Sequence, residues 1–311
     1  MSWTTKDIPD LSGKTAAITG VTGGLGVNTA IELGRHGASL YVTARDDAKA
    51  AAALKHIAND APGTPVEVVE LDLADLTATK AAAEGLLSSV EHLDILINNA
   101  GVMATPQRLT VDGFELQIGT NHLGHFAWTG TLWPLLNRSG TRVVTVASFA
   151  HTWVRGVDVR SLTTEGSPRR YRRWQSYGES KLSNLLFTLE FDRRLKSHGL
   201  PVVSVAAHPG YASTNITSTG PSLAGNSLPA MGMHQVSKIL AQPAAKGAWP
   251  LLMAATDESL TGGEYAGPSR MAHMRGKPKL VGMTSTARDA ELAGVVWTAS
   301  EQATGVEFPV S

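Results

Sequence analysis

Short apolar runs and longer helical patterns alternate along the first two hundred residues of the chain. Short runs that are nearly all apolar predict buried strands, and we expect six of them, at 15–19, 39–43, 66–71, 93–97, 142–147 and 202–206. Apolar residues recur with helical spacing in five other stretches, at 24–36, 46–57, 76–87, 114–136 and 177–197. Continuous apolar strands that alternate with helices are typical of a parallel sheet with helices on both faces.

The final third of the chain departs from this pattern in one stretch. Residues 215–245 combine proline and glycine with methionine and predict a long irregular loop, a kind of segment that usually has a function. A short strand near Tyr265 and a helix at 287–300 are expected after it. We therefore predict an α/β fold in one domain, residues 1–311, with a doubly wound parallel sheet of about seven strands.

A glycine-rich turn joins the first predicted strand to the first predicted helix. Gly20 permits a tight turn, Gly24 lets the backbone approach a pyrophosphate, and Gly26 lets the helix pack against the strand. The helix N-terminus would offer free N–H groups to the phosphates. An ordinary glycine-rich turn is the alternative, but the position favours a dinucleotide site. The predicted cofactor contacts here are Gly20, Thr22, Gly24, Leu25 and Gly26.

The end of the second predicted strand bears on the choice between NADP and NAD. An acidic residue there would accept hydrogen bonds from the ribose hydroxyls of NAD, but the position holds Ala44. Arg45 follows and could bind a 2′-phosphate, which favours NADP(H) and leaves NAD(H) possible. A surface arginine is the alternative. Asp46 and Asp47 fit the start of the next helix better than a ribose contact.

Tyr177 and Lys181 lie four residues apart and therefore on one face of the predicted helix 177–197. A protonated lysine beside a phenol favours the phenolate and should lower the pKa of Tyr177. The tyrosine would then serve as an acid–base group near neutral pH. Because such a pair also arises by chance, its meaning depends on what lies around it.

Several predicted strands end in short polar or glycine motifs. Ser148 follows the fifth strand, and the stretch 98–101 (Asn-Asn-Ala-Gly) follows the fourth. His208, Pro209 and Gly210 follow the sixth strand, with Thr214 just beyond. The carboxyl ends of parallel strands meet at one edge of the sheet, where ligands bind in open α/β folds. The sequence therefore predicts a site at that edge.

In order and spacing, these motifs resemble those of the short-chain dehydrogenase/reductase family, over residues 12 to about 270. The stretches 121–126 (Asn-His-Leu-Gly-His-Phe) and 177–184 resemble the retinol-dehydrogenase-like branch, and the tail resembles bacterial oxidoreductases of that branch. The resemblance implies a Rossmann fold and an oxidoreductase that transfers a hydride between NADP(H) and a hydrophobic ketone, aldehyde or secondary alcohol.

The resemblance also implies a role for each matching residue. Tyr177 would be the general acid/base, Lys181 would assist it and hold the nicotinamide ribose, and Ser148 would bind the substrate oxygen. Asn121 would hold a water that relays protons to Lys181. Asp72 would contact the adenine amino group, and Asn99 the ribose beside it. The other expected cofactor contacts are Leu73, Ala100, Gly101, Pro209, Gly210 and Thr214.

Composition excludes other classes of protein. The chain of 311 residues carries 27 basic and 27 acidic residues, so it lacks the basic excess of a nucleic-acid binder. It contains no cysteine, which excludes disulfides, thiol nucleophiles and cysteine-bound metals. Neither a secretory signal nor a membrane-spanning run is evident, so we expect a cytoplasmic protein without membrane contact. His122 and His125 are expected to pack structurally rather than bind a metal.

An insertion at 150–175, between Ser148 and Tyr177, is locally basic, with six arginines at 155, 160, 169, 170, 172 and 173 against Asp158 and Glu165. A solvated flap is the simpler interpretation, and a dock for an anionic part of the substrate is the other. Trp153 and Trp174 flank the insertion. They could line an apolar substrate pocket together with Met103, Ile216, Met231 and Met233.

Alternatives from other classes remain. A dinucleotide-binding regulator without turnover would be expected to lose one of its four catalytic candidates, and all four are present. A light-driven reductase that resembles protochlorophyllide reductase would need cysteines. The helices at 114–136 and 177–197 are those through which the family often assembles, so a dimer, a tetramer and a monomer all fit the sequence. The substrate, the direction and the stereochemistry are not encoded in any motif.

Overall fold

The computed structural model describes residues 3–137, 140–211, 242–271 and 273–310. One sheet of eight strands forms its centre, in the order β3-β2-β1-β4-β5-β6-β7-β8. The strands are β1 (Thr15–Ile18), β2 (Ser39–Ala44), β3 (Val66–Glu70), β4 (Ile95–Asn98), β5 (Arg142–Val146), β6 (Val203–Ala207), β7 (Tyr265–Arg270) and β8 (Arg275–Leu280). The first seven pair in parallel, and β8 pairs antiparallel with β7. The predicted doubly wound α/β fold is confirmed, with one strand more than the seven expected.

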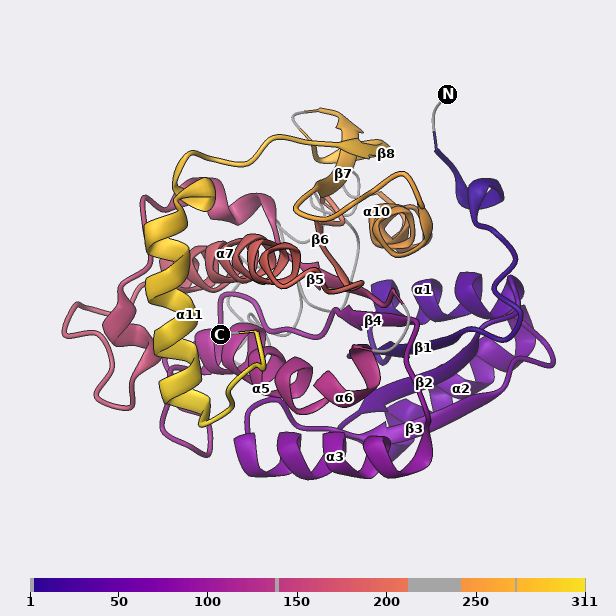
Figure 1. Cartoon of the computed structure of the whole chain (residues 1–311), viewed down its shortest axis with the longest axis horizontal. Coiled ribbons are helices and arrows are strands. Elements are labelled where there is room, and N and C mark those ends of the chain that lie inside the picture. The colour runs from indigo at the N-terminus through magenta and orange to yellow at the C-terminus, as the bar shows by residue number, and fades with distance from the viewer. Residues whose placement is uncertain (1–2, 138–139, 212–241, 272, 311) are drawn as a thin grey trace, which may run out of the picture.

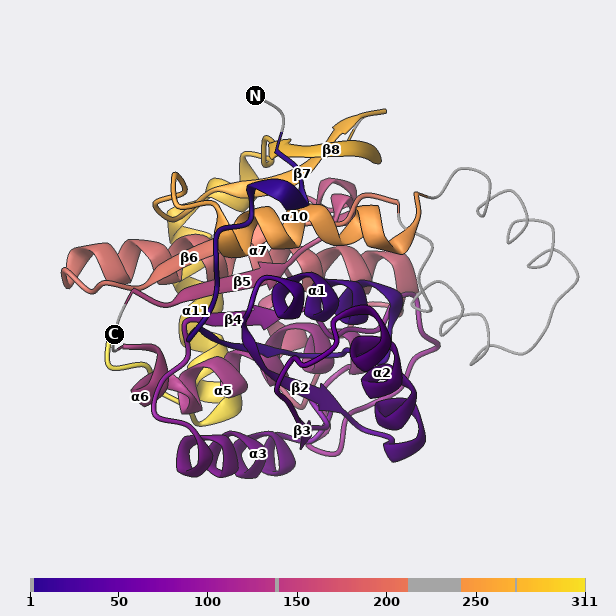
Figure 2. The same ribbon diagram turned by 90° about the vertical axis from the view of Figure 1, so that its right-hand side faces the viewer.

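Helices cover both faces of the sheet (Figures 1 and 2). One face carries α1 (Gly24–Arg35), α2 (Asp47–Asp60) and α10 (Ala244–Thr256). The other carries α3 (Leu76–Ser89), α5 (Gly124–Thr131), α6 (Trp133–Leu136) and α7 (Arg173–Ser197), and α11 (Ala290–Thr304) packs outside this layer. The strand order reverses between β1 and β4, and the crevice at such a switch point is the usual ligand site of an open α/β sheet.

An aromatic cluster fixes α7 in the second layer. Phe187 of α7 stacks on Trp297 of α11 with ring centroids 5.7 Å apart, and Phe191 lies tilted against the same ring at 5.9 Å. Phe126 of α5 meets Trp297 edge to face at 5.2 Å, and Phe308 closes the cluster from the C-terminal segment. Such pairs add to the burial of the rings, so the helix that carries Tyr177 and Lys181 is held firmly.

Two elements were not expected from the sequence. β8 contains three cationic residues, and only Pro278 of the strand is buried, so it shows no apolar run. Proline and lysine are typical of edge strands, which explains how it can still be a strand. α10 is buried on most sides, and Gly247 and Pro250 disguise it in the sequence. Its first residue falls inside the irregular loop expected at 215–245, most of which lies outside the described residues.

The expected helix at 114–136 is divided into shorter pieces. A short turn of α-helix, α4 (Leu116–Ile118), leads into a π-helical turn (Gly119–Leu123) and then into α5. α6 begins at Trp133, with a proline in its first turn. π-Helical turns are rare and often occur at functional sites, and this one carries Asn121.

Candidate active site

The carboxyl edge of β1, β2 and β4 forms a cleft of about 290 Å³. Its lining includes eleven of the residues predicted to contact a cofactor: Gly20, Thr22, Gly24, Leu25, Gly26, Arg45, Asp72, Leu73, Asn99, Ala100 and Gly101. Sequence reasoning missed Lys49, which follows Arg45 by four residues in the first turn of α2 and adds a second cation to the cleft. Gly23, Thr43, Ala44, Leu71, Val102 and Thr120 complete the lining.

Two glycines of the turn cannot carry a side chain without displacing backbone. Gly20 has a φ of +75°, and a Cβ built on it would lie 2.8 Å from the Cα of Ala100. A Cβ on Gly26 would lie 2.5 Å from the carbonyl oxygen of Gly20 and 2.8 Å from the Cα of Val21. The N-terminus of α1 therefore packs closely against the end of β1. Gly23, the N-cap residue, offers no side-chain cap, so the N–H groups of this turn face the cleft without one.

Thr19 joins the turn to the motif that follows β4. Its hydroxyl oxygen accepts hydrogen bonds from the backbone N–H groups of Asn99 and Ala100, both at 2.9 Å. The Asn99 side-chain amide donates to the carbonyl oxygens of Thr19 (2.7 Å) and Gly20 (3.3 Å). The structure thus places Asn99 as a brace of the glycine turn, a role that sequence reasoning did not foresee.

His125 contacts Thr19 at the junction between the glycine turn and the motif that follows β4. Its Nε2 lies 2.9 Å from the hydroxyl of Thr19, and its Nδ1 lies 3.0 Å from the carbonyl oxygen of Asn121. Burial lowers the pKa of His125 to about 3, so the ring is neutral, donates from Nδ1 and accepts at Nε2. His122 Nε2 lies 2.8 Å from Ser300 Oγ, whose hydroxyl donates to the carbonyl oxygen of Val296. Among the described residues, no group of three His, Cys, Asp or Glu side chains could hold a metal ion.

Arg45 and Asp72 face each other at the rim of the cleft. The guanidinium and the carboxylate lie 3.4 Å apart, and their side chains are 61% and 37% exposed. An exposed pair of this kind contributes at most about 1 kcal/mol, so it breaks easily when a ligand competes for the arginine. The Asp72 carboxylate also accepts a hydrogen bond from the N–H of Ala74, which fixes its position.

The four candidate catalytic side chains come from three elements. Tyr177 and Lys181 project from the first half of α7, Ser148 follows β5, and Asn121 lies in the π-helical turn. Lys181 Nζ donates to the carbonyl oxygen of Val146 at 2.9 Å. A Cβ on Gly101 would lie 2.9 Å from Asn121 Oδ1 and 3.7 Å from Lys181 Nζ, so these two side chains reach the same point beside the cleft.

Asn121 is held on every side. Its Oδ1 accepts from the N–H of Val102 at 2.8 Å, and its Nδ2 donates to the carbonyl oxygen of Val102 and to Ser180 Oγ, both at 2.9 Å. The side chain is fully buried. The π-helical turn therefore holds the Asn121 amide in a fixed position between the segment that follows β4 and helix α7.

Burial shifts the pKa values of the Tyr–Lys pair in opposite directions. Desolvation of the cation lowers the pKa of Lys181 to about 8. Desolvation of the phenolate raises the pKa of Tyr177, and hydrogen bonding with Ser148 opposes that shift only in part. The sequence predicts the opposite direction for Tyr177, because it shows the neighbouring lysine but not the depth at which the phenol is buried.

The motif His208-Pro209-Gly210 follows β6 at the same carboxyl edge of the sheet. Gly210 has a φ of +67°, and its N–H donates to His208 Nδ1 at 3.2 Å. The carbonyl oxygen of Pro209 accepts from the side-chain amide of Gln242 at 2.8 Å. Thr214 and the expected pocket residues Ile216, Met231 and Met233 lie outside the described residues.

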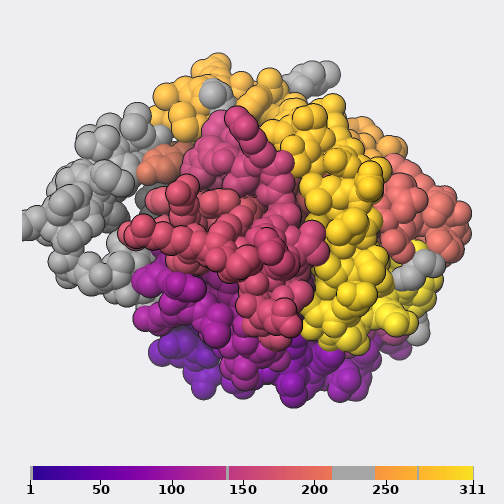
Figure 3. Space-filling model, turned by 90° about the vertical axis from the view of Figure 1, so that its left-hand side faces the viewer, coloured from indigo at the N-terminus to yellow at the C-terminus, as the bar shows by residue number. Residues whose placement is uncertain are grey.

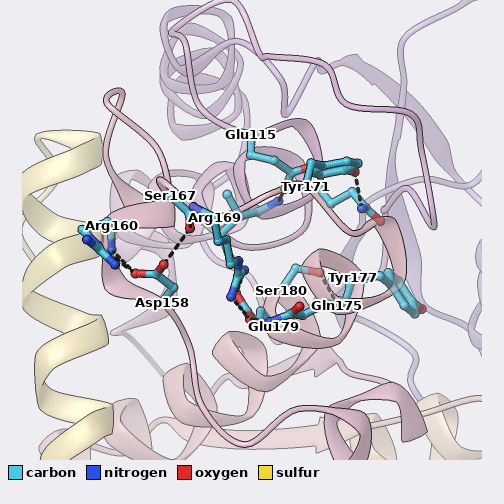
Figure 4. Close-up of polar contacts among 12 residues, drawn as sticks. Glu115, Asp158, Arg160, Ser167, Arg169, Tyr171, Gln175, Tyr177, Glu179 and Ser180 are labelled. Atoms are coloured by element: carbon cyan, nitrogen blue, oxygen red, sulfur yellow. Dashed lines mark hydrogen bonds and ion pairs between the residues drawn. The ribbon is translucent and has the colours of Figure 1, made fainter.

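The insertion at 150–175 is anchored to the body of the protein (Figure 4). Arg169 forms a bidentate ion pair with the buried carboxylate of Glu179 on α7, and Gln175 donates to the same carboxylate at 3.1 Å. The Tyr171 hydroxyl lies 2.9 Å from the carbonyl oxygen of Thr105 and accepts from Gln117 at 2.8 Å. These contacts fix the insertion directly beside Tyr177.

Within the described part of the chain, no helix combines the length and the apolar character needed to span a bilayer.

Comparison with known proteins assigns the chain to a family. The short chain dehydrogenase model matches residues 14–222. Retinol dehydrogenase 12 of Mus musculus is 43% identical over 208 residues, which make up 67% of this chain and 64% of that protein. Retinol dehydrogenase 13 of Homo sapiens is 35% identical over 305 residues, or 96% of this chain and 87% of that protein.

A solved structure is similar over nearly the whole chain. The crystal structure of an uncharacterised protein from Mycobacterium paratuberculosis is 41% identical, with a TM-score of 0.80, and the match covers 99% of this chain and 100% of that one. The family match spans the glycine turn, the motifs at the strand ends and the Tyr177–Lys181 pair. It supports an enzyme over a regulator without turnover. The chain therefore belongs to the short-chain dehydrogenase/reductase family, as an NAD(P)-dependent enzyme of its retinol-dehydrogenase-like branch.

Proposed function

We propose that the protein is an NADP-dependent oxidoreductase for an apolar ketone, aldehyde or secondary alcohol, with Tyr177 as general acid/base. The observation that carries the proposal is the arrangement of four side chains at one edge of the sheet: Asn121, Ser148, Tyr177 and Lys181. Tyr177 and Lys181 are buried, and both lie on the side of α7 that faces the strand ends. Similarity to retinol dehydrogenases supports an apolar substrate.

The glycine turn fits a dinucleotide. Gly20 and Gly26 keep the turn so tight that no Cβ is accommodated, and the N-terminus of α1 is free of side-chain caps. Backbone N–H groups in this setting bind phosphate well. Arg45 and Lys49 would add positive charge at the adenosine end, and Asp72 and Asn99 would line the same end. The bound nicotinamide would supply the hydride chemistry.

The residues of the chain would handle the substrate oxygen and its proton. Ser148 lies within hydrogen-bond reach of Tyr177, so a carbonyl oxygen placed between the two hydroxyls would be held by both. Because burial raises the pKa of Tyr177, the phenol keeps its proton at neutral pH and can donate it in the direction of reduction. Lys181, through its positive charge, would stabilise the phenolate that remains. Asn121 would hold the groups through which Tyr177 regains the proton that it has donated.

A panel of apolar ketones and aldehydes tests this function. NADPH oxidation, followed by nicotinamide absorbance, should show turnover with at least one member of the panel, and the reverse reaction should oxidise the matching alcohol. NADH is the comparison. Tight NADPH binding without turnover of any carbonyl compound or alcohol in the panel would contradict the proposed substrate class.

Arg45 should determine the preference for NADPH. A charge-assisted contact to the 2′-phosphate is worth roughly 1.5–3 kcal/mol, so NADPH should bind at least about tenfold more tightly than NADH. Arg45→Ala should remove most of that difference and leave the Kd of NADH unchanged. Arg35→Ala is the matched control, because Arg35 pairs with Glu32 on the surface, 2.7 Å away. Equal affinities of the unmodified protein for the two cofactors, measured by calorimetry, would refute the preference.

A further inference from the structure

An open groove of about 1320 Å³ runs between the insertion and the beginning of α7. It is lined by residues 105–107, residues 153–158, Arg169, residues 171–175 and Glu179. Figure 3 shows the face on which the insertion lies, beside α11. The groove is separate from the cleft at the carboxyl edge of β1, β2 and β4, because the two share no lining residue.

The apolar part of the groove adjoins Tyr177 through the ring of Trp174. The ring of Trp174 lies edge to face with Tyr177, with centroids 6.5 Å apart, and Trp153 meets Trp174 in the same way at 5.8 Å. Trp174 is 47% exposed and Trp153 is 55% exposed. Contiguous apolar surface often marks a binding site, and these two rings contact each other in the groove wall. The two tryptophan rings thus connect the ring of Tyr177, which does not itself line the groove, with the groove wall.

The charged part of the groove has an excess of positive charge. Its lining holds four arginines and two carboxylates. Both carboxylates are engaged: Glu179 binds Arg169, and Asp158 binds Arg160 and accepts from Ser167. The other three lining arginines, at positions 155, 172 and 173, are exposed, and none forms an ion pair with a carboxylate in the described part of the chain. Arg169 is thus structural, and the unpaired cations are its neighbours.

Arg172 and Arg173 stand at an unfavourable place for cations. They are the N-cap and the first residue of the 25-residue helix α7, whose first turn contains no acidic residue, and Arg172 provides no side-chain cap. A positive charge next to the positive end of a helix dipole costs about 0.3–1 kcal/mol. A negatively charged ligand between these side chains would interact favourably with the helix dipole and would neutralise the excess positive charge of the groove.

We propose that this groove binds the anionic far end of the substrate. The carbonyl group would lie at Tyr177, an aliphatic or aromatic middle part would lie on Trp174 and Trp153, and a carboxylate or phosphate would meet Arg172, Arg173 and Arg155. The inference rests on the proposed function, since it places the reacting carbonyl at Tyr177. The groove would select substrates that are apolar in the middle and negatively charged at one end, and the basic insertion would recognise the charged end.

The test compares three methyl ketones of equal length: 2-decanone, 9-oxodecanoate and 9-oxodecyl phosphate. The unmodified enzyme should have a KM at least about tenfold lower for a charged ketone than for 2-decanone, a difference of ~1.4 kcal/mol. The better of the two charged ketones identifies the anion as carboxylate or phosphate. Added salt should raise the KM of the charged ketone only, because exposed charges are screened.

The double substitution Arg172→Gln with Arg173→Gln should abolish this advantage. The KM of the charged ketone should rise about tenfold, while its kcat and both constants for 2-decanone stay unchanged. The matched control is Arg170→Gln with Arg288→Gln, two exposed arginines that neither line the groove nor pair with one of its carboxylates. Equal losses in both double variants, or no preference of the unmodified enzyme for either charged ketone, would overturn the proposal.

A direct binding measurement separates this proposal from the proposed function. Decanoate and decyl phosphate, titrated by calorimetry against the NADPH-loaded protein, should include one that binds more tightly than decan-1-ol, and the Arg172/Arg173 variant should lose that difference. Anion binding without turnover of any ketone would retain the groove and reject the proposed reaction. Turnover of 2-decanone without anion binding would retain the reaction and reject the groove.

Discussion

Tyr177→Phe should lower kcat at least about a hundredfold in both directions, because general acid–base catalysis contributes roughly 10²–10⁴-fold to a rate. The change removes one oxygen whose hydrogen bonding is with Ser148, and the ring keeps its contact with Trp174. The Kd of NADPH should therefore stay within about twofold, a free-energy difference below ~0.5 kcal/mol. Single-turnover kinetics and calorimetry on the same preparation separate the two quantities.

Tyr41→Phe is the control for this prediction. It deletes the same atom from a tyrosine on β2 whose hydroxyl lies 3.5 Å from Glu67, far along the sheet from α7. It should leave turnover unchanged. Residual activity of Tyr177→Phe within about tenfold of the unmodified enzyme would show that another group donates the proton.

The pH dependence gives an independent readout of the same residue. A raised pKa means that Tyr177 carries its proton throughout the neutral range, so reduction has its acid available there. Oxidation needs the phenolate, so its rate should rise with pH. Lys181, with a pKa of about 8, is a cation below that pH and loses its charge above it, so reduction should decline on the alkaline side. The alkaline rise in oxidation should be missing from any residual activity of Tyr177→Phe.

The sequence predicts this site well where local chain geometry decides the outcome. A parallel strand, a tight glycine turn and a helix follow one another at 15–35, so the position of Gly20 and Gly26 at a sheet edge follows from the chain order alone. The motifs after β4, β5 and β6 reach the same edge for the same reason, because parallel strands end together. Seven of the eight strands were predicted, six from short apolar runs and one near Tyr265.

What the sequence does not predict depends on contacts between distant segments. The ion pair of Arg169 with Glu179 joins the insertion to α7, and no local pattern distinguishes Arg169 from Arg170. The junction of Thr19 with Asn99 spans 80 residues. The pKa of Tyr177 was predicted in the wrong direction because burial is a property of the whole fold. β8 escaped notice because an exposed edge strand needs no apolar run.

Gly26→Ala should weaken NADPH binding about a hundredfold, or ~2.7 kcal/mol, which is the worth of one or two hydrogen bonds to a charged group. The new Cβ would lie 2.5 Å from the carbonyl oxygen of Gly20 and 2.8 Å from the Cα of Val21. Both are backbone atoms, so the turn itself has to move, and its N–H groups move away from the position that a pyrophosphate requires. Overpacking of this kind also costs about 1–3 kcal/mol of folding free energy, so Tm should fall by several degrees.

Gly85→Ala separates the effect of the turn from that of the substitution itself. Gly85 lies within α3, and a Cβ there meets no atom within 4 Å. Alanine in a helix interior is favoured over glycine by about 1 kcal/mol, so this variant should gain stability and bind NADPH as before. Calorimetric titration gives the Kd of NADPH for each of the two variants, and thermal unfolding gives the Tm of each. If Gly26→Ala bound NADPH as tightly as Gly85→Ala, the glycine turn would not be the seat of the pyrophosphate, because a displaced backbone could not present the same N–H groups.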